Sequence, residues 1–392
     1  MTDFTAEDRR WMQMAIDLSR QGEGKVEPNP MVGCVLVRDG QEIGHGFHRS
    51  FGGPHAEVDA LARSSSARGA TAYVTLEPCC HYGKTPPCSD ALIAAGVGRV
   101  VVACRDPHPQ VDGGGIESLR QAGIHVQIGL LAEEAAQVLA PFLKRVNTGF
   151  PWVIAKWAMS IDGRIATSSG QSQWITGEAS RRQVHRLRSR CDGIVVGMGT
   201  VEADDPLLTA RGSESDSDDH SAGNRTLHRI VYCRHRVPSL ASQLVRSASQ
   251  LSDRSPVVLV VHPSISDQQL KPLSEHGVRS IRCQSHDESE MVIESLPILA
   301  SELGLTNVIV EGGSTLLGRF FDANQIDECH VYVGAKLIGG TGAPGPVGDP
   351  GSSKLADCPL WELQKIDQYD SDLRVIYRLR ASKGLSKGQL EI

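Results

Sequence analysis

The chain has 392 residues, a net charge of −6 and an ordinary composition, with 40% hydrophobic and 22% charged residues. Because one hydrophobic core rarely organises so long a chain, we expect two domains, and the composition excludes overall disorder. The first residues, "MTDFTAEDRRWMQ", lack the apolar stretch of a secretory signal, and no apolar run reaches the roughly 18 residues of a membrane span. We therefore expect a cytoplasmic protein without a membrane partner. In neither half do basic residues exceed acidic ones, which argues against a nucleic-acid partner.

The first part of the chain alternates helical and extended patterns. Residues 5–22 have the spacing of an amphipathic helix with Thr5 as candidate N-cap, and residues 31–47 predict a hairpin that turns at Asp39-Gly40. Further elements are predicted as a helix from His55, a strand at 71–77, a helix at 89–97, a strand at 99–104 and a helix at 131–149. This alternation predicts an α/β layer with a largely parallel sheet. "GFP" at 149–151 is the expected junction, so we place the domains at 1–148 and 149–392.

A second α/β unit follows the junction. Its predicted elements are strands at 152–160, 193–198, 229–233, 257–261, 307–311 and 328–338, with helices at 177–190 and after the Gly-Gly of "GGSTLLGRFF". The acidic, Ser-rich stretch at 213–224 is expected to be a solvated surface insertion.

A cluster of cysteines stands out in the first domain. "TLEPCCHYGKTPPC", residues 75–88, contains Cys79, Cys80, His81 and Cys88. In a chain without a secretion signal, clustered thiols indicate metal binding or catalysis before they indicate disulfides. "PHAE", residues 54–57, adds a histidine and a glutamate upstream.

These residues match the ligand set of zinc nucleobase deaminases, which use one His and two Cys and leave a fourth position for water. The predicted ligands are His55, Cys79 and Cys88. Zinc brings the pKa of water toward neutrality, and Glu57 is placed to take up a proton and return it to the ring nitrogen and the leaving ammonia.

A structural zinc site is the alternative, and it would need Cys80 or His81 as a fourth ligand. Eight residues separate Cys79 from Cys88, which departs from the short P-C-x-x-C spacing. Cys88 still precedes a predicted helix, and two adjacent cysteines do not easily reach one ion. We therefore expect Cys80 to be a bystander and favour the catalytic interpretation.

Four stretches carry a wider resemblance. "PNPMVGCVLV", "HAEVxAL", "TLEPCCHYGKTPPCSDALI" and "GFPWVIAKWAMSIDGRIA" resemble the bifunctional riboflavin-biosynthesis deaminase-reductase family from about residue 8 to residue 380. The resemblance implies an α/β chain with a cytidine-deaminase-like three-layer domain followed by a dihydrofolate-reductase-like domain.

The resemblance also implies the chemistry. The first domain would use Zn²⁺ to deaminate 2,5-diamino-6-ribosylamino-4(3H)-pyrimidinone 5′-phosphate, here called the diaminopyrimidine phosphate. The second would use NADPH to reduce the ribosyl chain of the product to ribityl. The expected partners are these small phosphorylated pyrimidines and other copies of the chain in a homo-oligomer.

Site residues follow by matching positions. Asn29, His48 and His81 correspond to residues that line the pyrimidine pocket. In the second domain "VIVEGGSTLLG" reads as a strand, a turn and a helix start, where backbone N–H groups favour a phosphate, although alone this signal is weak. The resemblance implies NADPH contacts at Ala158, Trp174, Thr200, Asp204, Gly313, Ser314, Thr315, Leu316, Leu317, Gly318 and Arg319. It implies substrate contacts at Lys156, Ser172, Arg188, Leu208, Arg211 and Glu311.

One position departs from the family. After "RIV" the family usually shows an Asp-Ser-like pair, whereas this chain reads Tyr232-Cys233-Arg234, which makes Arg234 a candidate for the 2′-phosphate of NADPH.

Two other functions remain as alternatives. The first is a nucleic-acid base deaminase with a C-terminal binding domain, which needs a basic groove with aromatic platforms. The second is a non-enzymatic, zinc-stabilised binding module, whose mark would be a closed four-ligand site. The even charge and 5% aromatic content disfavour the first of them.

Overall fold

The computed structural model describes residues 4–82, 86–109, 111, 113–210, 226–348 and 350–380. The chain divides into two units, and the division falls between Gly149 and Phe150, within the predicted junction. Each unit is described by itself. The predicted insertion at 213–224 lies outside the described residues.

The first unit is built on one mixed sheet in the order β2-β1-β3-β4-β5. The predicted hairpin is confirmed, since β1 pairs antiparallel with β2 and the chain turns at Asp39 and Gly40, both with positive φ. The expectation of a largely parallel sheet is wrong for this part, because β1 also pairs antiparallel with β3, and only β3, β4 and β5 run parallel. The strands are β1 (Gly33–Arg38), β2 (Gln41–Phe47), β3 (Thr71–Leu76), β4 (Arg99–Cys104) and β5 (His125–Ile128).

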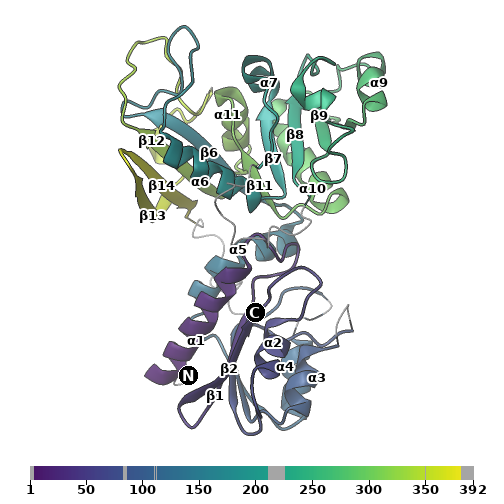
Figure 1. Cartoon of the computed structure of the whole chain (residues 1–392), viewed down its shortest axis with the longest axis vertical. Coiled ribbons are helices and arrows are strands. Elements are labelled where there is room, and N and C mark those ends of the chain that lie inside the picture. Colours follow the sequence, from purple (N-terminus) through teal and green to yellow (C-terminus); the bar gives the residue numbers. More distant parts are fainter. Residues whose placement is uncertain are drawn as a thin grey trace. The chain divides into compact units, whose positions relative to one another are not determined.

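Helices cover both faces of this sheet and give three layers (Figure 1). Helices α1 (Ala6–Ser19) and α5 (Ala132–Thr148) pack on one face, where Met12, Ile16 and Val138 meet Val35 and Val101. The other face carries α2 (Ala56–Ala62), α3 (Cys88–Ala94) and α4 (Gly114–Gln121). Thr5 caps α1 as predicted. Because both faces are covered, the central strands are apolar throughout rather than alternating.

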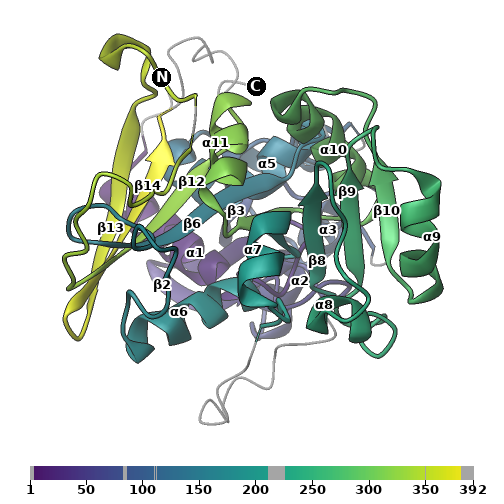
Figure 2. The same cartoon turned by 90° about the horizontal axis from the view of Figure 1, so that it is seen from above.

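The second unit holds a larger sheet in the order β10-β9-β8-β7-β11-β6-β12-β14-β13. All neighbours from β10 to β12 run parallel, and the hairpin of β14 and β13 adds an antiparallel edge. Figure 2 shows this hairpin at one side of the sheet and β10 with α9 at the other. The strands are β6 (Trp152–Ser160), β7 (Gly193–Gly197), β8 (His228–Cys233), β9 (Val257–Val261), β10 (Arg279–Arg282), β11 (Asn307–Val310), β12 (Glu328–Gly334), β13 (Trp361–Tyr369) and β14 (Asp372–Leu379).

Two sets of helices enclose the parallel part of this sheet. Helices α10 (Glu288–Glu302) and α11 (Ser314–Asp322) pack on one face. The other face is covered by α6 (Glu178–Ser189), α7 (Met198–Asp204), α8 (Gln243–Arg246) and α9 (Asp267–Glu275). The carboxyl ends of β6, β7, β8 and β11 open on one edge, where ligands of α/β sheets usually bind. Among the described residues, no helix is both long and apolar enough to cross a bilayer.

Candidate active sites

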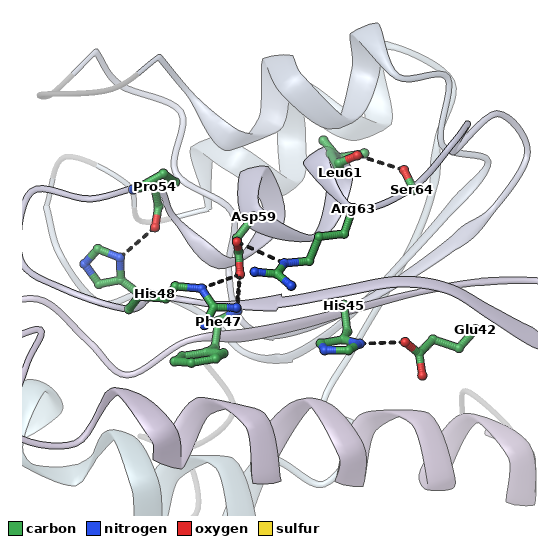
Figure 3. A network of polar contacts seen from close by, with 10 residues as sticks. Glu42, His45, Phe47, His48, Pro54, Asp59, Leu61, Arg63 and Ser64 are labelled. Carbon is green, nitrogen blue, oxygen red and sulfur yellow. Dashed lines mark hydrogen bonds and ion pairs between the residues drawn. The ribbon is translucent and has the colours of Figure 1, made fainter. Parts of the chain in front are cut away.

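Helix α2 is fixed on strand β2 by one carboxylate (Figure 3). Asp59 Oδ2 accepts hydrogen bonds from the Phe47 backbone N–H at 3.3 Å and from Arg49 Nη2 at 3.0 Å, and Asp59 Oδ1 accepts from Arg63 Nε at 3.3 Å. Arg49 and Arg63 lower the pKa of Asp59, although burial acts in the opposite direction. These contacts fix the start of the helix, where His55 is the N-cap and Glu57 lies in the first turn.

Three side chains from separate elements converge at this helix start. The ligand atoms of His55, Cys79 and Cys88 lie within 4.8 Å of one another, with His55 Nδ1 3.2 Å from Cys88 Sγ and 3.5 Å from Cys79 Sγ. Cys79 follows β3, and Cys88 is the first residue of α3. Ser89 ties these two segments together, because its N–H and hydroxyl both donate to the Cys79 carbonyl at 3.2 Å. One imidazole and two thiols are a donor set that suits zinc.

The neighbouring cysteine points elsewhere. Cys80 is absent from the group that could hold a metal among the described residues, and its Sγ lies 3.9 Å from the Val111 carbonyl oxygen. His81 lies beside the site and lines the same cavity as Cys79. Its Nδ1 is buried and makes no hydrogen bond within the described chain. The geometry therefore supports a three-ligand centre with an open side rather than a closed one.

The electrostatics of the group suit both metal binding and proton transfer. Burial raises the pKa of Glu57 to about 7, and the charge of Cys79 adds to the rise. A hydrogen bond from the Cys88 thiol lowers the pKa of Cys79, which favours the thiolate form of this sulfur, while the same bond raises the pKa of Cys88. The hydrogen bond to Cys79 raises the pKa of His55. A carboxyl group that titrates near neutral pH can both accept and return a proton.

A cavity of about 300 Å³ opens over this centre, and the three residues predicted to contact the pyrimidine all line it. His48 Nδ1 lies 2.9 Å from the Pro54 carbonyl oxygen, which only accepts, so Nδ1 carries the proton (Figure 3). His48 Nε2 is then the acceptor for Asn29 Nδ2 at 3.2 Å. Burial lowers the pKa of His48, which keeps this ring neutral. The side chain of Asn29 is thereby oriented by a neutral imidazole.

Three further residues of this cavity had no predicted role. Glu77, Asp106 and His108 line it from the ends of β3 and β4. Burial raises the pKa of Asp106 to about 6. The signal that could have found them is positional, since neighbouring parallel strands end at the same edge of a sheet.

The second unit contains a larger cavity of about 630 Å³ at the carboxyl ends of its central strands. The predicted contacts that line it are Lys156, Ala158, Ser172, Thr200, Asp204, Glu311, Gly313, Ser314, Thr315, Leu316, Leu317 and Arg319. Trp174, Arg188, Leu208 and Gly318 do not line it, although Arg188 pairs with the lining residue Glu311. Trp174 is exposed beside Arg181, Leu208 is buried, and Gly318 packs against the backbone of Gly348. Arg211 lies outside the described residues.

Two cations meet one buried carboxylate, Glu311, which lines this cavity together with Lys156. Arg188 Nε and Nη2 donate to the two oxygens of Glu311 at 2.6 and 2.9 Å, and Lys156 Nζ lies 3.6 Å from Glu311 Oε2. Burial would raise the pKa of Glu311, but Arg188 and Lys156 lower it to about 2. Two positive charges against one negative charge leave a net positive site that fits a phosphate or a sugar hydroxyl.

The cavity also carries a helix start and two guanidinium groups. Gly313 is the N-cap of α11 and provides no side-chain cap, so a bound phosphate could take hydrogen bonds from the N–H groups of the first turn. Glu288 pairs with Arg234 through Oε1 at 2.7 Å and with Arg319 through Oε2 at 2.6 Å. All three line the cavity, and these donors fit a phosphorylated dinucleotide.

Comparisons with known proteins agree on one family. Residues 5–104 match the cytidine and deoxycytidylate deaminase zinc-binding region, and residues 151–375 match the RibD C-terminal domain. The riboflavin biosynthesis protein RibD of Haemophilus influenzae is 38% identical over 96% of this chain and 99% of its own length, and that of Escherichia coli is 40% identical over 94% and 98%. The chain belongs to the RibD family.

Solved RibD structures share its fold. Acinetobacter baumannii RibD superimposes with a TM-score of 0.81 at 37% identity and covers 95% of this chain and 99% of its own. A Thermotoga maritima protein is described as a diaminohydroxyphosphoribosylaminopyrimidine deaminase and 5-amino-6-(5-phosphoribosylamino)uracil reductase. It superimposes with a TM-score of 0.78 at 33% sequence identity and has the same coverage of both chains. The predicted family, fold class and enzyme class are confirmed. As a RibD-family chain it is an enzyme of riboflavin biosynthesis, with a zinc-binding deaminase domain and an NADPH-dependent reductase domain.

Proposed function

We propose that residues 1–148 deaminate the diaminopyrimidine phosphate and that residues 149–392 reduce the ribosyl chain of the product with NADPH. The convergence of His55, Cys79 and Cys88 beside the buried Glu57 carries the first half of this proposal. The division after Gly149 and the family matches on either side of it support the two boundaries.

In the first unit His55, Cys79 and Cys88 would hold the zinc, which when bound lowers the pKa of water. Glu57 would accept one proton from the attacking water and deliver it to the ring nitrogen, and it would then pass the second proton of that water to the amino group, which leaves as ammonia. Asn29, held by the neutral His48, presents an oriented amide to one edge of the pyrimidine. The unpaired, buried Nδ1 of His81 offers another polar contact to the substrate within the described cavity.

In the second unit the residues would bind NADPH and the substrate and align them with each other. NADPH, when bound, supplies the hydride. The first turn of α11 and the guanidinium groups of Arg234 and Arg319 would hold its phosphates. Arg188 and Lys156 would meet the substrate phosphate or ribose, while Glu311 keeps these two cations in place. Reduction then depends mainly on how the sugar carbon is aligned with the nicotinamide.

One experiment tests both halves. The purified protein is incubated with the diaminopyrimidine phosphate, with and without NADPH, and ammonia and nicotinamide absorbance are followed separately. We expect ammonia in both arms and NADPH oxidation only when deamination has occurred. If neither signal appears, the proposal is wrong; a single-stranded nucleic acid that releases ammonia instead would favour the alternative of a nucleic-acid base deaminase.

Arg188→Ala is expected to raise the reductase KM about 10-fold to 100-fold, the range for losing a hydrogen bond to a charged group. Lys156 still neutralises Glu311 in this variant, so the unit should remain folded. Deamination should be unchanged. Arg182→Ala is the matched control, because Arg182 lies on the same helix and pairs only with the exposed Glu178 among the described residues. An unaltered KM would remove Arg188 from the site.

Arg234→Gln tests the 2′-phosphate contact. Its side chain is 56% exposed in the cavity, so a ligand phosphate can reach it. We expect the Kd for NADPH to rise about 10-fold while the Kd for NADH stays the same, because only NADPH carries the 2′-phosphate. Nicotinamide fluorescence measures both constants. Arg246→Gln on α8, outside this cavity, is the control, and an equal loss for both nucleotides would contradict the assignment.

The phosphorylated substrates support a cytoplasmic location, since such metabolites do not cross membranes unaided. Assembly into a homo-oligomer stays a prediction that sedimentation of the purified chain would test.

A further inference from the structure

Glu77 is a buried carboxylate that the deaminase chemistry does not use. It follows β3, lies two residues before Cys79, and is 3% exposed. Its Oε1 accepts the N–H groups of Gly115 and Ile116, both at 3.1 Å, and its Oε2 accepts those of Asp106 at 3.4 Å and Gly113 at 3.3 Å. Two donors on each oxygen occupy its lone pairs, so this carboxylate is committed to the backbone and is not available to a ligand.

These donors belong to one segment that starts after β4. Gly113 is the N-cap of α4 and has no side chain to cap the helix, while Gly115 and Ile116 lie in its first turn. Glu77 therefore caps α4 from another strand, and its negative charge lies at the positive end of the helix. Asp106 lies just after β4, so a single carboxylate binds the backbone at Asp106 and again at the start of α4.

The start of α4 also touches the turn that presents Cys79. A Cβ added at Gly115 would lie 1.8 Å from the Pro78 carbonyl oxygen, and one at Gly114 would lie 2.7 Å from Cys80 Sγ. Only glycines allow the helix to approach the turn so closely. The helix start and the turn 78–80 consequently cannot shift independently of each other.

The segment held in this way forms one wall of the cavity over the metal centre. Asp106, His108 and Val111 line it together with Cys79 and His81. We propose that Glu77 is a positioning residue for the deaminase, which fixes the wall formed by Asp106, His108 and Val111 against the turn 78–80 and so sets how the pyrimidine is held. This inference rests on the proposed deamination. It concerns substrate affinity rather than the metal. Cys79 is also held by Ser89, whose N–H and hydroxyl donate to its carbonyl oxygen, and the predicted ligands His55 and Cys88 come from other segments.

Glu77→Gln tests the proposal. Glutamine has the same size, but its amide keeps one acceptor oxygen and turns an NH₂ group toward N–H donors, so half of the bonds are lost. We expect the KM for the diaminopyrimidine phosphate to rise at least about 10-fold, in line with the loss of a few backbone contacts. The zinc content, kcat within a few-fold and the reductase activity of the same chain should be retained.

Two further variants make the result specific. Glu117→Gln is the matched control, because it removes an exposed carboxylate from the same first turn, where Glu117 contacts Gln121. Gly115→Ala leaves every carboxylate in place but pushes the helix away from Pro78. It should raise the same KM, and it replaces Glu77→Gln as the test if that variant folds poorly.

The outcomes separate the inference from the function on which it rests. An unchanged KM in both Glu77→Gln and Gly115→Ala overturns the inference alone, provided that the unaltered chain releases ammonia. If Glu77→Gln loses its zinc and its kcat falls with it, the inference is also overturned, because Glu77 would then support the metal centre rather than the wall of the cavity. If the unaltered chain releases no ammonia, the proposed deamination is wrong and the inference falls with it.

Discussion

Glu57→Gln is expected to lower the rate of ammonia release about 10³-fold, in the middle of the range for removing a general acid–base group. The amide has the same shape as the carboxyl group, so it fits the buried position, where Glu57 is 3% exposed. It cannot accept a proton, and therefore neither activates water nor returns the proton to the ring. Zinc content should be unchanged, because Glu57 is not among the residues that could hold the metal.

The measurement is a coupled ammonia assay beside metal analysis of the same preparation. Glu42→Gln is a suitable control, since Glu42 lies on β2 and its Oε1 is 2.6 Å from Nδ1 of the half-buried His45, outside the cavity. Retained zinc shows that the first unit of the variant is folded, and reductase activity on separately deaminated substrate shows the same for the second unit. Ammonia release at the unaltered rate would show that another group transfers the proton.

The raised pKa of Glu57 also leads us to expect that the deamination rate of the unaltered chain depends on pH. The pKa of Glu57 is raised to about 7, chiefly by burial, so its proton-accepting form is lost as the pH falls below that value. The kcat/KM for deamination should therefore decline on the acid side of neutrality. A carboxyl group with an ordinary pKa would keep the rate constant down to about pH 5.

Local patterns were sufficient to predict which three side chains come together as candidate metal ligands. His55 precedes a helix, Cys79 follows a buried strand and Cys88 begins another helix, and each of these places is marked by residues within a few positions of it. The order of the motifs then indicated their convergence. The exclusion of Cys80 also came from a local argument, that adjacent cysteines point apart, and the structure turns its sulfur toward Val111.

Contacts between distant segments were not accessible in this way. The four hydrogen bonds of Glu77 join it to backbone N–H groups from Asp106 to Ile116, and no periodicity in the sequence around Glu77 or around these residues predicts them. The pairing of β1 with β3 was missed for a similar reason, because hydrophobic runs predict burial but not which neighbour a strand chooses. Likewise Glu288, at the start of α10, joins two arginines that lie far apart in sequence.

Replacing the cysteines one at a time gives the sharpest test of the metal centre. Cys79→Ser and Cys88→Ser should each lose nearly all bound zinc and with it ammonia release, because a neutral hydroxyl is a far weaker ligand than a thiolate. Cys80→Ser should keep about one zinc ion per chain and most of the activity, since three ligands define a single site. Metal analysis after gel filtration, with ammonia release on the same samples, measures both.

The three variants control for one another, because each changes one sulfur to oxygen within the same short stretch of chain. Cys79 and Cys88 contact each other and His55, so losing either sulfur leaves two donors, too few for tight binding. Cys80 packs instead against the start of α4, where the smaller oxygen atom is tolerated. If Cys80→Ser alone released the metal, Cys80 would be a ligand, and the site would be closed and structural. That result would remove the open position on which the deaminase chemistry depends.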